Sequence, residues 1–156
     1  MDYAKLFTTK TVVRDLKEVE KEKILREIVD QLRERKLLTD EAAKEAISAI
    51  LKREELGSTG IGNAVAIPHA KLKKLDRIVA AVAVSDNGID FGAIDGEFVS
   101  LVFMILSPAD RSDEHLAVLR WLSTLVRNSD FCRFARTSKT PKDMVALIEE
   151  MSASVK

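Results

Sequence analysis

The stretch that decides the fold is residues 57–69, which read GSTGIGNAVAIPH. Three glycines and two hydroxyl side chains lead into a short apolar segment, and a Pro-His pair ends it. Pro68 restricts its own φ and favours extended backbone at Ile67, so the chain enters His69 with little freedom. Histidine is the side chain best suited to exchanging protons or phosphoryl groups near neutral pH. His69, at the end of a predicted short strand, is therefore the first candidate for a functional residue.

Helical patterns precede this stretch and strand patterns follow it. Apolar residues recur at helical spacing over residues 20–36. A second helix, capped by Thr39 or Asp40, is expected to end near Gly57. Three apolar, β-branched runs predict strands, and those that are apolar at consecutive positions are typical of strands covered on both faces: residues 65–67, 77–84 and 98–106.

The two ends of the chain complete the prediction. A short edge strand is expected at residues 11–13, and turns at residues 85–88 and 95–96 separate the strands. Three helices are expected in the C-terminal part: one capped by Ser112 or Asp113, one near residues 130–136, and one capped by Thr140 that runs to about Met151. The first of them carries the apolar residues Leu116, Leu119, Leu122, Leu125 and Val126. Without repeats or linkers, residues 1–156 are predicted to form a single α/β domain with a central mixed sheet flanked by helices.

Composition narrows the function classes. Lys+Arg and Asp+Glu are 25 each, so the formal net charge is zero and a nucleic-acid partner is not expected. The lone cysteine, Cys132, excludes an internal disulfide and a CxxC motif and fits a reducing compartment. No signal peptide is evident, and the longest apolar run, residues 79–84, is too short to cross a bilayer. We therefore expect a cytoplasmic protein with no membrane insertion.

The glycine loop differs from nucleotide-binding loops. Gly57 and Gly62 have the spacing of a Walker A loop, but Asn63 and Ala64 stand where that motif needs Lys and Ser or Thr. The glycine order also differs from the dinucleotide pattern, and a helix precedes the loop where both motifs need a strand. The alternative is a helix-to-strand connection with unusual backbone angles. We expect no nucleotide cofactor.

Two further residues could act beside His69. If Ser112 caps its helix, His115 lies in the first turn, where the free N–H groups favour an anion and disfavour imidazolium. A neutral His115 could donate one hydrogen bond to a phosphate; the alternative is an exposed residue without a role. Arg53 could stabilise a phosphoryl group with its planar donors, or form an ordinary exposed pair with Glu54. The two histidines lie 46 positions apart without a cysteine cluster, so no metal site is expected.

The run from Arg53 to His69 resembles the active-site signature of enzyme IIA domains of the fructose/mannitol type. These belong to the bacterial phosphoenolpyruvate-dependent sugar phosphotransferase system, and nitrogen-regulatory IIA proteins are their free-standing relatives. The resemblance extends over most of the chain and includes His115. It implies that His69 accepts a phosphoryl group, that His115 hydrogen-bonds the phosphoryl oxygens and that Arg53 stabilises charge. The loop residues that would shape the site are Ser58, Thr59, Gly60 and Gly62.

The resemblance also implies partners. The donor would be the carrier protein HPr or its nitrogen-branch paralogue, and the regulatory branch is preferred because the chain carries no transporter segment. Two alternatives stay open: a sugar-specific IIA that passes phosphate to a IIB domain, and a regulator that binds a target protein without transfer. One departure is Ala64, where the family commonly has glycine. Because alanine rarely adopts positive φ, ordinary extended backbone is expected at that position.

Overall fold

A mixed six-stranded sheet forms the centre of the computed structural model, which describes residues 2–155. The strand order is β1-β5-β6-β3-β2, and β4 also pairs with β6. The long hairpin of β5 and β6 is antiparallel, as is the short pair of β2 and β3. β1 runs parallel to β5, and β3 and β4 run parallel to β6. The strands are β1 (Val12–Val13), β2 (Gly60–Gly62), β3 (Val65–Ala66), β4 (His69–Leu72), β5 (Val79–Ile89) and β6 (Val99–Pro108).

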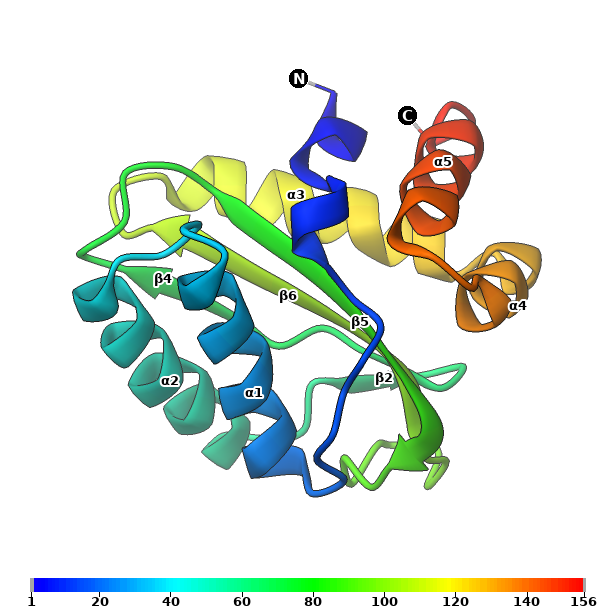
Figure 1. Ribbon diagram of the computed structural model, residues 1–156, viewed down its shortest axis with the longest axis horizontal. Helices are drawn as coiled ribbons and strands as arrows, with labels where there is room; N and C mark the ends of the chain where they lie inside the picture. The colour runs from blue at the N-terminus through cyan, green and yellow to red at the C-terminus, as the bar shows by residue number, and fades with distance from the viewer. Residues whose placement is uncertain (1, 156) are drawn as a thin grey trace.

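Helices cover both faces of this sheet, which gives a three-layer α/β architecture (Figure 1). The first layer holds α1 (Lys21–Glu34) and α2 (Asp40–Glu55). The opposite layer holds α3 (Ser112–Val126), α4 (Ser129–Thr137) and α5 (Pro141–Ser152). Two short 3-10 helices, η1 (Tyr3–Leu6) and η2 (Thr9–Thr11), precede β1, and η1 packs against α5. The prediction of an α/β domain with a central mixed sheet is confirmed.

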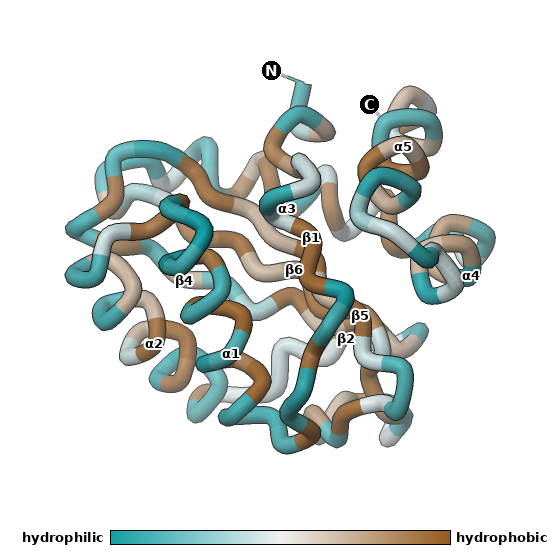
Figure 2. The backbone as a smooth tube through the Cα atoms, in the orientation of Figure 1, coloured by the Kyte–Doolittle hydropathy of each residue, from teal (hydrophilic) through white to brown (hydrophobic). Residues whose placement is uncertain are grey.

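The core consists of two apolar layers separated by the sheet. Alternate residues of β5 and β6 face opposite sides: Ala81 and Met104 pack toward α1 and α2, whereas Val82 and Phe103 pack toward the other helices. Figure 2 shows the central strands as predominantly hydrophobic and the outer sides of the helices as largely hydrophilic. Burial on both faces explains why the sequence of these strands is apolar at consecutive positions instead of alternating.

Most predicted helix boundaries are confirmed within two residues. Thr39 caps α2 by accepting a hydrogen bond from the amide of Ala42, and Thr140 caps α5 by accepting one from Asp143. Such caps contribute about 1 kcal/mol each. The edge strand expected at residues 11–13 is confirmed for Val12 and Val13, which form β1 beside β5. Thr11 is not part of it, because this residue ends the preceding 3-10 helix.

The predicted cap of the first helix in the C-terminal part was wrong. Ser112 does not cap α3: the helix begins at Ser112, and Arg111 is its N-cap residue without a side-chain cap. The hydroxyl of Ser112 instead accepts a hydrogen bond of 3.2 Å from Nζ of Lys71. Among the apolar residues of this helix, Leu116 is 50% exposed. The helix turns Val118, Trp121 and Leu122 toward the sheet, which leaves Leu116 outside this stripe.

The turn expected at residues 85–88 is an irregular part of a strand. β5 continues to Ile89, and the register shifts so that Val84 pairs with Leu101 and Ile89 with Val99. The polar residues in between lie in a bulge, where positive φ at Gly88 is accommodated. The chain reverses later, at the other predicted turn, where Gly96 adopts a φ of 74°.

Candidate functional site

His69 begins strand β4, so the expectation that it ends a strand was wrong. β3 stops at Ala66, and both β3 and β4 lie parallel to β6. Pro68 has no N–H to donate, so it separates the two strands, while its carbonyl still accepts a 3.0 Å hydrogen bond from Ile105. The two short strands therefore continue along the same side of β6, and His69 lies at the point where pairing resumes.

The His69 ring is oriented by its own backbone. Nδ1 lies 2.8 Å from the carbonyl oxygen of Ile67. A carbonyl only accepts, so Nδ1 carries the hydrogen and donates it. In a neutral imidazole, this leaves the lone pair on Nε2. The half-buried ring therefore presents a nucleophilic nitrogen on the side away from the backbone.

His115 lies beside His69, as the resemblance implies. Ala70 and Leu72 point into the core below α1 and α2, so His69 faces the opposite layer, where α3 lies. The centroids of the two imidazole rings are 5.6 Å apart. His115 is only 6% exposed, and its Nδ1 lies 2.6 Å from Oγ of Ser107. The alternative of an exposed first-turn histidine is therefore wrong.

Both imidazoles are held in the neutral form near pH 7. Burial lowers the pKa of His115 to about 4, and a proton on the neighbouring His69 and the positive charge of Lys71 add to this effect. The pKa of His69 is also lowered, chiefly by burial. The hydrogen bond to the carbonyl of Ile67 raises the pKa of His69 and so partly offsets the effect of burial. The positive charge of Arg53 lowers this pKa further, and the negative charge of Glu54 raises it. A neutral His69 is the nucleophilic form of the side chain.

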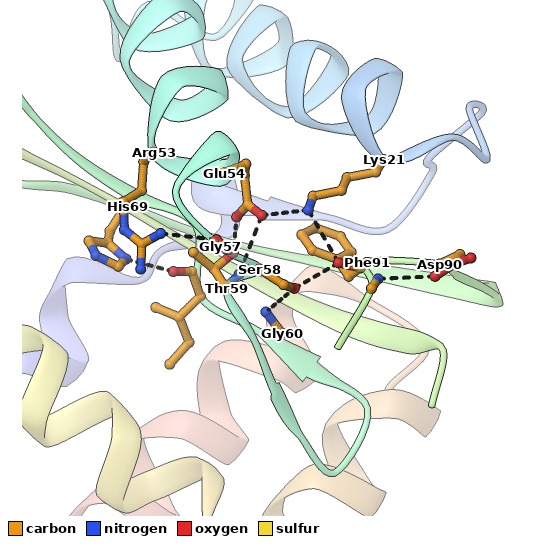
Figure 3. Close-up of polar contacts among 12 residues, drawn as sticks. Lys21, Arg53, Glu54, Gly57, Ser58, Thr59, Gly60, His69, Asp90 and Phe91 are labelled. Atoms are coloured by element: carbon orange, nitrogen blue, oxygen red, sulfur yellow. Dashed lines mark hydrogen bonds and ion pairs between the residues drawn. The ribbon is translucent and has the colours of Figure 1, made fainter. Parts of the chain in front are cut away.

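Arg53 lies in the last turn of α2, at the end where His69 is found (Figure 3). Its Nη1 donates a 3.0 Å hydrogen bond to the carbonyl of Gly57. This hydrogen bond ties the guanidinium to the start of the glycine loop. The positive charge of Arg53 contributes to the lowered pKa of His69. This position fits a group that stabilises a nearby anion.

The loop hydroxyls are engaged in a network that sequence reasoning did not identify (Figure 3). Both the amide and the hydroxyl of Thr59 donate to the carboxylate of Glu54. That carboxylate also pairs with Nζ of Lys21, at 2.5 Å. Ser58 donates to the carbonyl of Phe91 at 2.7 Å and accepts from the amide of Gly60 at 3.0 Å. Ser58 and Thr59 therefore fix the path of the loop between α2 and β2.

Gly60 and Gly62 of the loop are needed for different reasons. A Cβ on Gly60 would lie 2.8 Å from the Cβ of Ala93, closer than real contacts allow. Gly62 adopts a φ of 95°, which L side chains rarely do. Gly60 therefore permits close packing of the loop against residues 91–96, and Gly62 permits the backbone to enter a tight turn.

The expectation for Ala64 was wrong. Gly62 pairs with Val65, so Asn63 and Ala64 form a two-residue hairpin loop, and their φ angles are 56° and 63°. Hairpins of this length use left-handed backbone at both loop positions because that twist matches the flanking strands. Pairing with the sheet stabilises this unfavourable backbone conformation, because the carbonyl of Ala64 accepts hydrogen bonds from the amides of Ser100 and Leu101.

Two residues of the site had only weak sequence signals. Ser107 is the first polar residue after the apolar run of residues 101–106, and Glu54 was considered only as an exposed partner of Arg53.

Within residues 2–155, no group of three or more His, Cys, Asp or Glu side chains could hold a metal ion. No helix of the same residues has the length and apolar character needed to cross a membrane.

Comparisons with known proteins identify the fold and the family. Residues 5–151 match the family model "Phosphoenolpyruvate-dependent sugar phosphotransferase system, EIIA 2". The chain is 32% identical over 148 residues to a nitrogen regulatory protein of Bradyrhizobium diazoefficiens, with 95% of each protein covered. The crystal structure of the nitrogen regulatory protein IIA-Ntr from Neisseria meningitidis superimposes with a TM-score of 0.84 at 27% identity, covering 93% of this chain and 97% of the other.

A more distant structure has the same fold. It is the Escherichia coli mannitol enzyme IIA in its complex with phosphorylated enzyme IIB, with a TM-score of 0.76 at 18% identity and coverage of 92% of this chain and 97% of that one. The family match spans the glycine loop and both histidines. The chain belongs to the EIIA type 2 family of the phosphoenolpyruvate-dependent sugar phosphotransferase system.

Proposed function

We propose that the protein is a phosphocarrier in which Nε2 of His69 accepts a phosphoryl group from a phosphohistidine of an HPr-like carrier. One observation carries the assignment of the acceptor atom: the hydrogen bond from Nδ1 to Ile67 leaves the lone pair on Nε2. In the transfer, the N–P bond of the donor breaks as the Nε2–P bond of His69 forms. The donor imidazole leaves with its electron pair, so no oxidant or cofactor is needed.

The other residues stabilise the charge of the transferred group. Phosphoryl transfer depends mainly on positioning and on compensation of the equatorial oxygens. Arg53, tied to Gly57, would supply a fixed positive charge, and neutral His115 would supply a hydrogen bond. Ser58, Thr59, Gly60 and Gly62 would act indirectly, because their contacts shape the loop.

The decisive experiment is phosphorylation in a reconstituted system of phosphoenolpyruvate, enzyme I and an HPr-like carrier. Wild type and an exposed control variant, Lys139→Ala, should both take up acid-labile phosphate. His69→Ala should take up none. Uptake by His69→Ala at the wild-type rate would overturn the assignment of the acceptor.

We further propose that the protein belongs to the regulatory branch and acts in the cytoplasm by signalling through its phosphorylation state. The match to nitrogen regulatory proteins over nearly the whole chain supports this branch. A target protein should bind wild type and His69→Asp with different affinities, because the added charge alters the site. Equal binding of both forms and of the phosphorylated protein would contradict phosphate-controlled signalling toward that target.

A sugar-specific role is the second candidate, because the mannitol enzyme IIA of the same fold forms a complex with phosphorylated enzyme IIB. In that case the phosphorylated protein would lose its label to a IIB domain of the fructose or mannitol type. Retention of the label in the presence of such domains supports the regulatory branch.

A further inference from the structure

Ser107 lies directly behind the second histidine of the site. It is a residue of β6, it is fully buried, and it pairs in register with Lys71 of β4. Because Phe103 and Ile105 of the same strand face α3, Ser107 faces that helix as well. Its Oγ lies 2.6 Å from Nδ1 of His115, and the contact is buried.

The hydrogen-bonding capacity of the two groups determines which of them donates in this contact. A serine hydroxyl carries one hydrogen, and a buried hydroxyl without an acceptor is costly. Among residues 2–155, Oγ of Ser107 has one hydrogen-bond partner, Nδ1 of His115, and no buried polar side-chain atom is unsatisfied. The hydroxyl therefore donates and Nδ1 accepts. In a neutral ring the hydrogen then resides on Nε2.

We propose that Ser107 is a positioning residue that fixes His115 as its Nε2–H tautomer, so that this histidine donates a hydrogen bond to the phosphoryl group on His69. The inference rests on the proposed function. The two rings then have opposite tautomers: His69 presents a lone pair on Nε2, and His115 presents a hydrogen. The first nitrogen attacks phosphorus, and the second stabilises a non-bridging oxygen.

The tautomer matters because His115 carries no charge that could replace it. A cationic ring would carry hydrogens on both nitrogens, but burial keeps His115 neutral near pH 7. Without the Ser107 hydroxyl, the neutral ring would populate the Nδ1–H tautomer as well. In that form Nε2 carries a lone pair, which repels the phosphoryl oxygens. His115 then donates no hydrogen bond to the phosphoryl group during transfer.

The first test needs no variant. The ring nitrogens of His115 in wild type, labelled with 15N, should show the Nε2–H pattern at pH 7. A dominant Nδ1–H pattern would overturn the inference even if His69 is phosphorylated normally. Conversely, a wild type that takes up no phosphate but shows the Nε2–H pattern would refute the proposed function while the tautomer assignment holds.

The second test uses a pair of variants with nearly the same shape. Ser107→Thr retains the hydroxyl, whereas Ser107→Val replaces it with a methyl group. The valine variant should show mixed tautomers at His115 and a phosphorylation rate about tenfold below that of the threonine variant, as expected for one hydrogen bond to a charged group. Equal rates and equal tautomer populations in the two variants would overturn the inference.

If threonine is too large for the buried position, Ser107→Ala gives the same comparison against wild type. Thermal unfolding of each variant shows whether it is folded. A purely structural role would lower the unfolding temperature without changing the 15N pattern of His115, and that outcome would also overturn the inference.

Discussion

Lys21 at the first position of α1 and Glu54 near the end of α2 form an ion pair of 2.5 Å beneath the glycine loop. The side chain of Glu54 is only 7% exposed, and it also accepts hydrogen bonds from Thr59. Nζ of Lys21 reaches the carbonyl of Phe91 as well, at 3.2 Å. One carboxylate thus joins two helices to the loop that leads to His69.

This relationship predicts that Glu54→Gln is destabilising. The amide retains the shape but loses the charge, so Lys21 loses its partner and Thr59 loses a charged acceptor. Because Lys21 is partly exposed, we expect the free energy of unfolding to fall by about 2 kcal/mol, below the full cost of breaking a buried pair. Urea denaturation measures this change. The control is Glu55→Gln, an exposed neighbour that should change stability by less than about 0.5 kcal/mol. Equal effects of both substitutions would contradict the role of the ion pair.

Ala64→Gly is predicted to stabilise the protein. Ala64 holds a φ of 63°, which costs a residue with a Cβ about 1–2 kcal/mol. Glycine removes that cost but adds chain entropy to the unfolded state, about 0.4–1 kcal/mol. The net expectation is a gain of about 0.5–1 kcal/mol, measured as a higher midpoint in urea.

The matched control for this substitution is Ala66→Gly. Ala66 is a fully buried residue of β3 with ordinary strand pairing, opposite Val102 of β6. Glycine there should destabilise the protein, because the substitution removes a packed methyl group and increases the entropy of the unfolded chain. It relieves no backbone strain in return. A loss of stability in Ala64→Gly comparable to that of Ala66→Gly would show that the left-handed conformation is not strained.

Gly60→Ala is predicted to disturb the loop by collision. Its Cβ would meet Cβ of Ala93 at 2.8 Å and Cα of the same residue at 3.2 Å. The loop or the 91–96 segment must move, and overpacking of this kind costs about 1–3 kcal/mol. The phosphorylation rate should also fall, because the loop leads to His69.

A second substitution separates collision from other effects of Gly60→Ala. Ala93→Gly removes the nearer of the two clashing atoms. The double variant should therefore be more stable than the sum of the two single effects predicts, by about 1 kcal/mol. Strict additivity in the double-mutant cycle would contradict the packing explanation.

Periodicity revealed the layers of the fold but not the details of its loops. The apolar runs of β5 and β6 predicted strands covered on both faces, and the caps Thr39 and Thr140 were identified from residue type and position. The bulge in residues 85–88 was mistaken for a turn because polar residues followed by glycine are common in both turns and bulges. The two can be distinguished only by the pairing on either side, and here β5 pairs with β6 both before and after the bulge.

His69 and the loop residues of the candidate site could be named from the sequence because the glycine loop and the Pro-His pair are local features. The partners of those residues could not, since the contacts form only when separate elements pack together. Glu54 meets Lys21 across 33 positions. Ser107 is only eight positions from His115, but the contact requires α3 to fold back over β6. Ala64 was mispredicted because the demands of a two-residue hairpin outweigh the preference of alanine.

The burial of His115 and the half-burial of His69 predict a dependence of stability on pH. The pKa of His115 is lowered from 6.5 to about 4 in the folded protein, and that of His69 is lowered as well. The unfolded state therefore binds more protons than the folded state between about pH 4 and 6.5. The contribution of His115 to the free energy of unfolding should rise with pH across this window and be complete above it. Urea denaturation from pH 4 to 8 measures the effect.

Carboxylates titrate in the lower part of the same window, so the histidine contribution must be isolated by difference. His115→Gln retains hydrogen-bonding capacity toward Ser107 but binds no proton between pH 4 and 8. The stability of wild type relative to this variant should therefore increase between pH 5 and pH 7 and stay constant from pH 7 to pH 8. The opposite slope, with wild type gaining relative stability as the pH falls, would mean that folding favours a charged His115. A protonated ring would need no tautomer selection by Ser107, so this measurement also bears on how the second histidine acts.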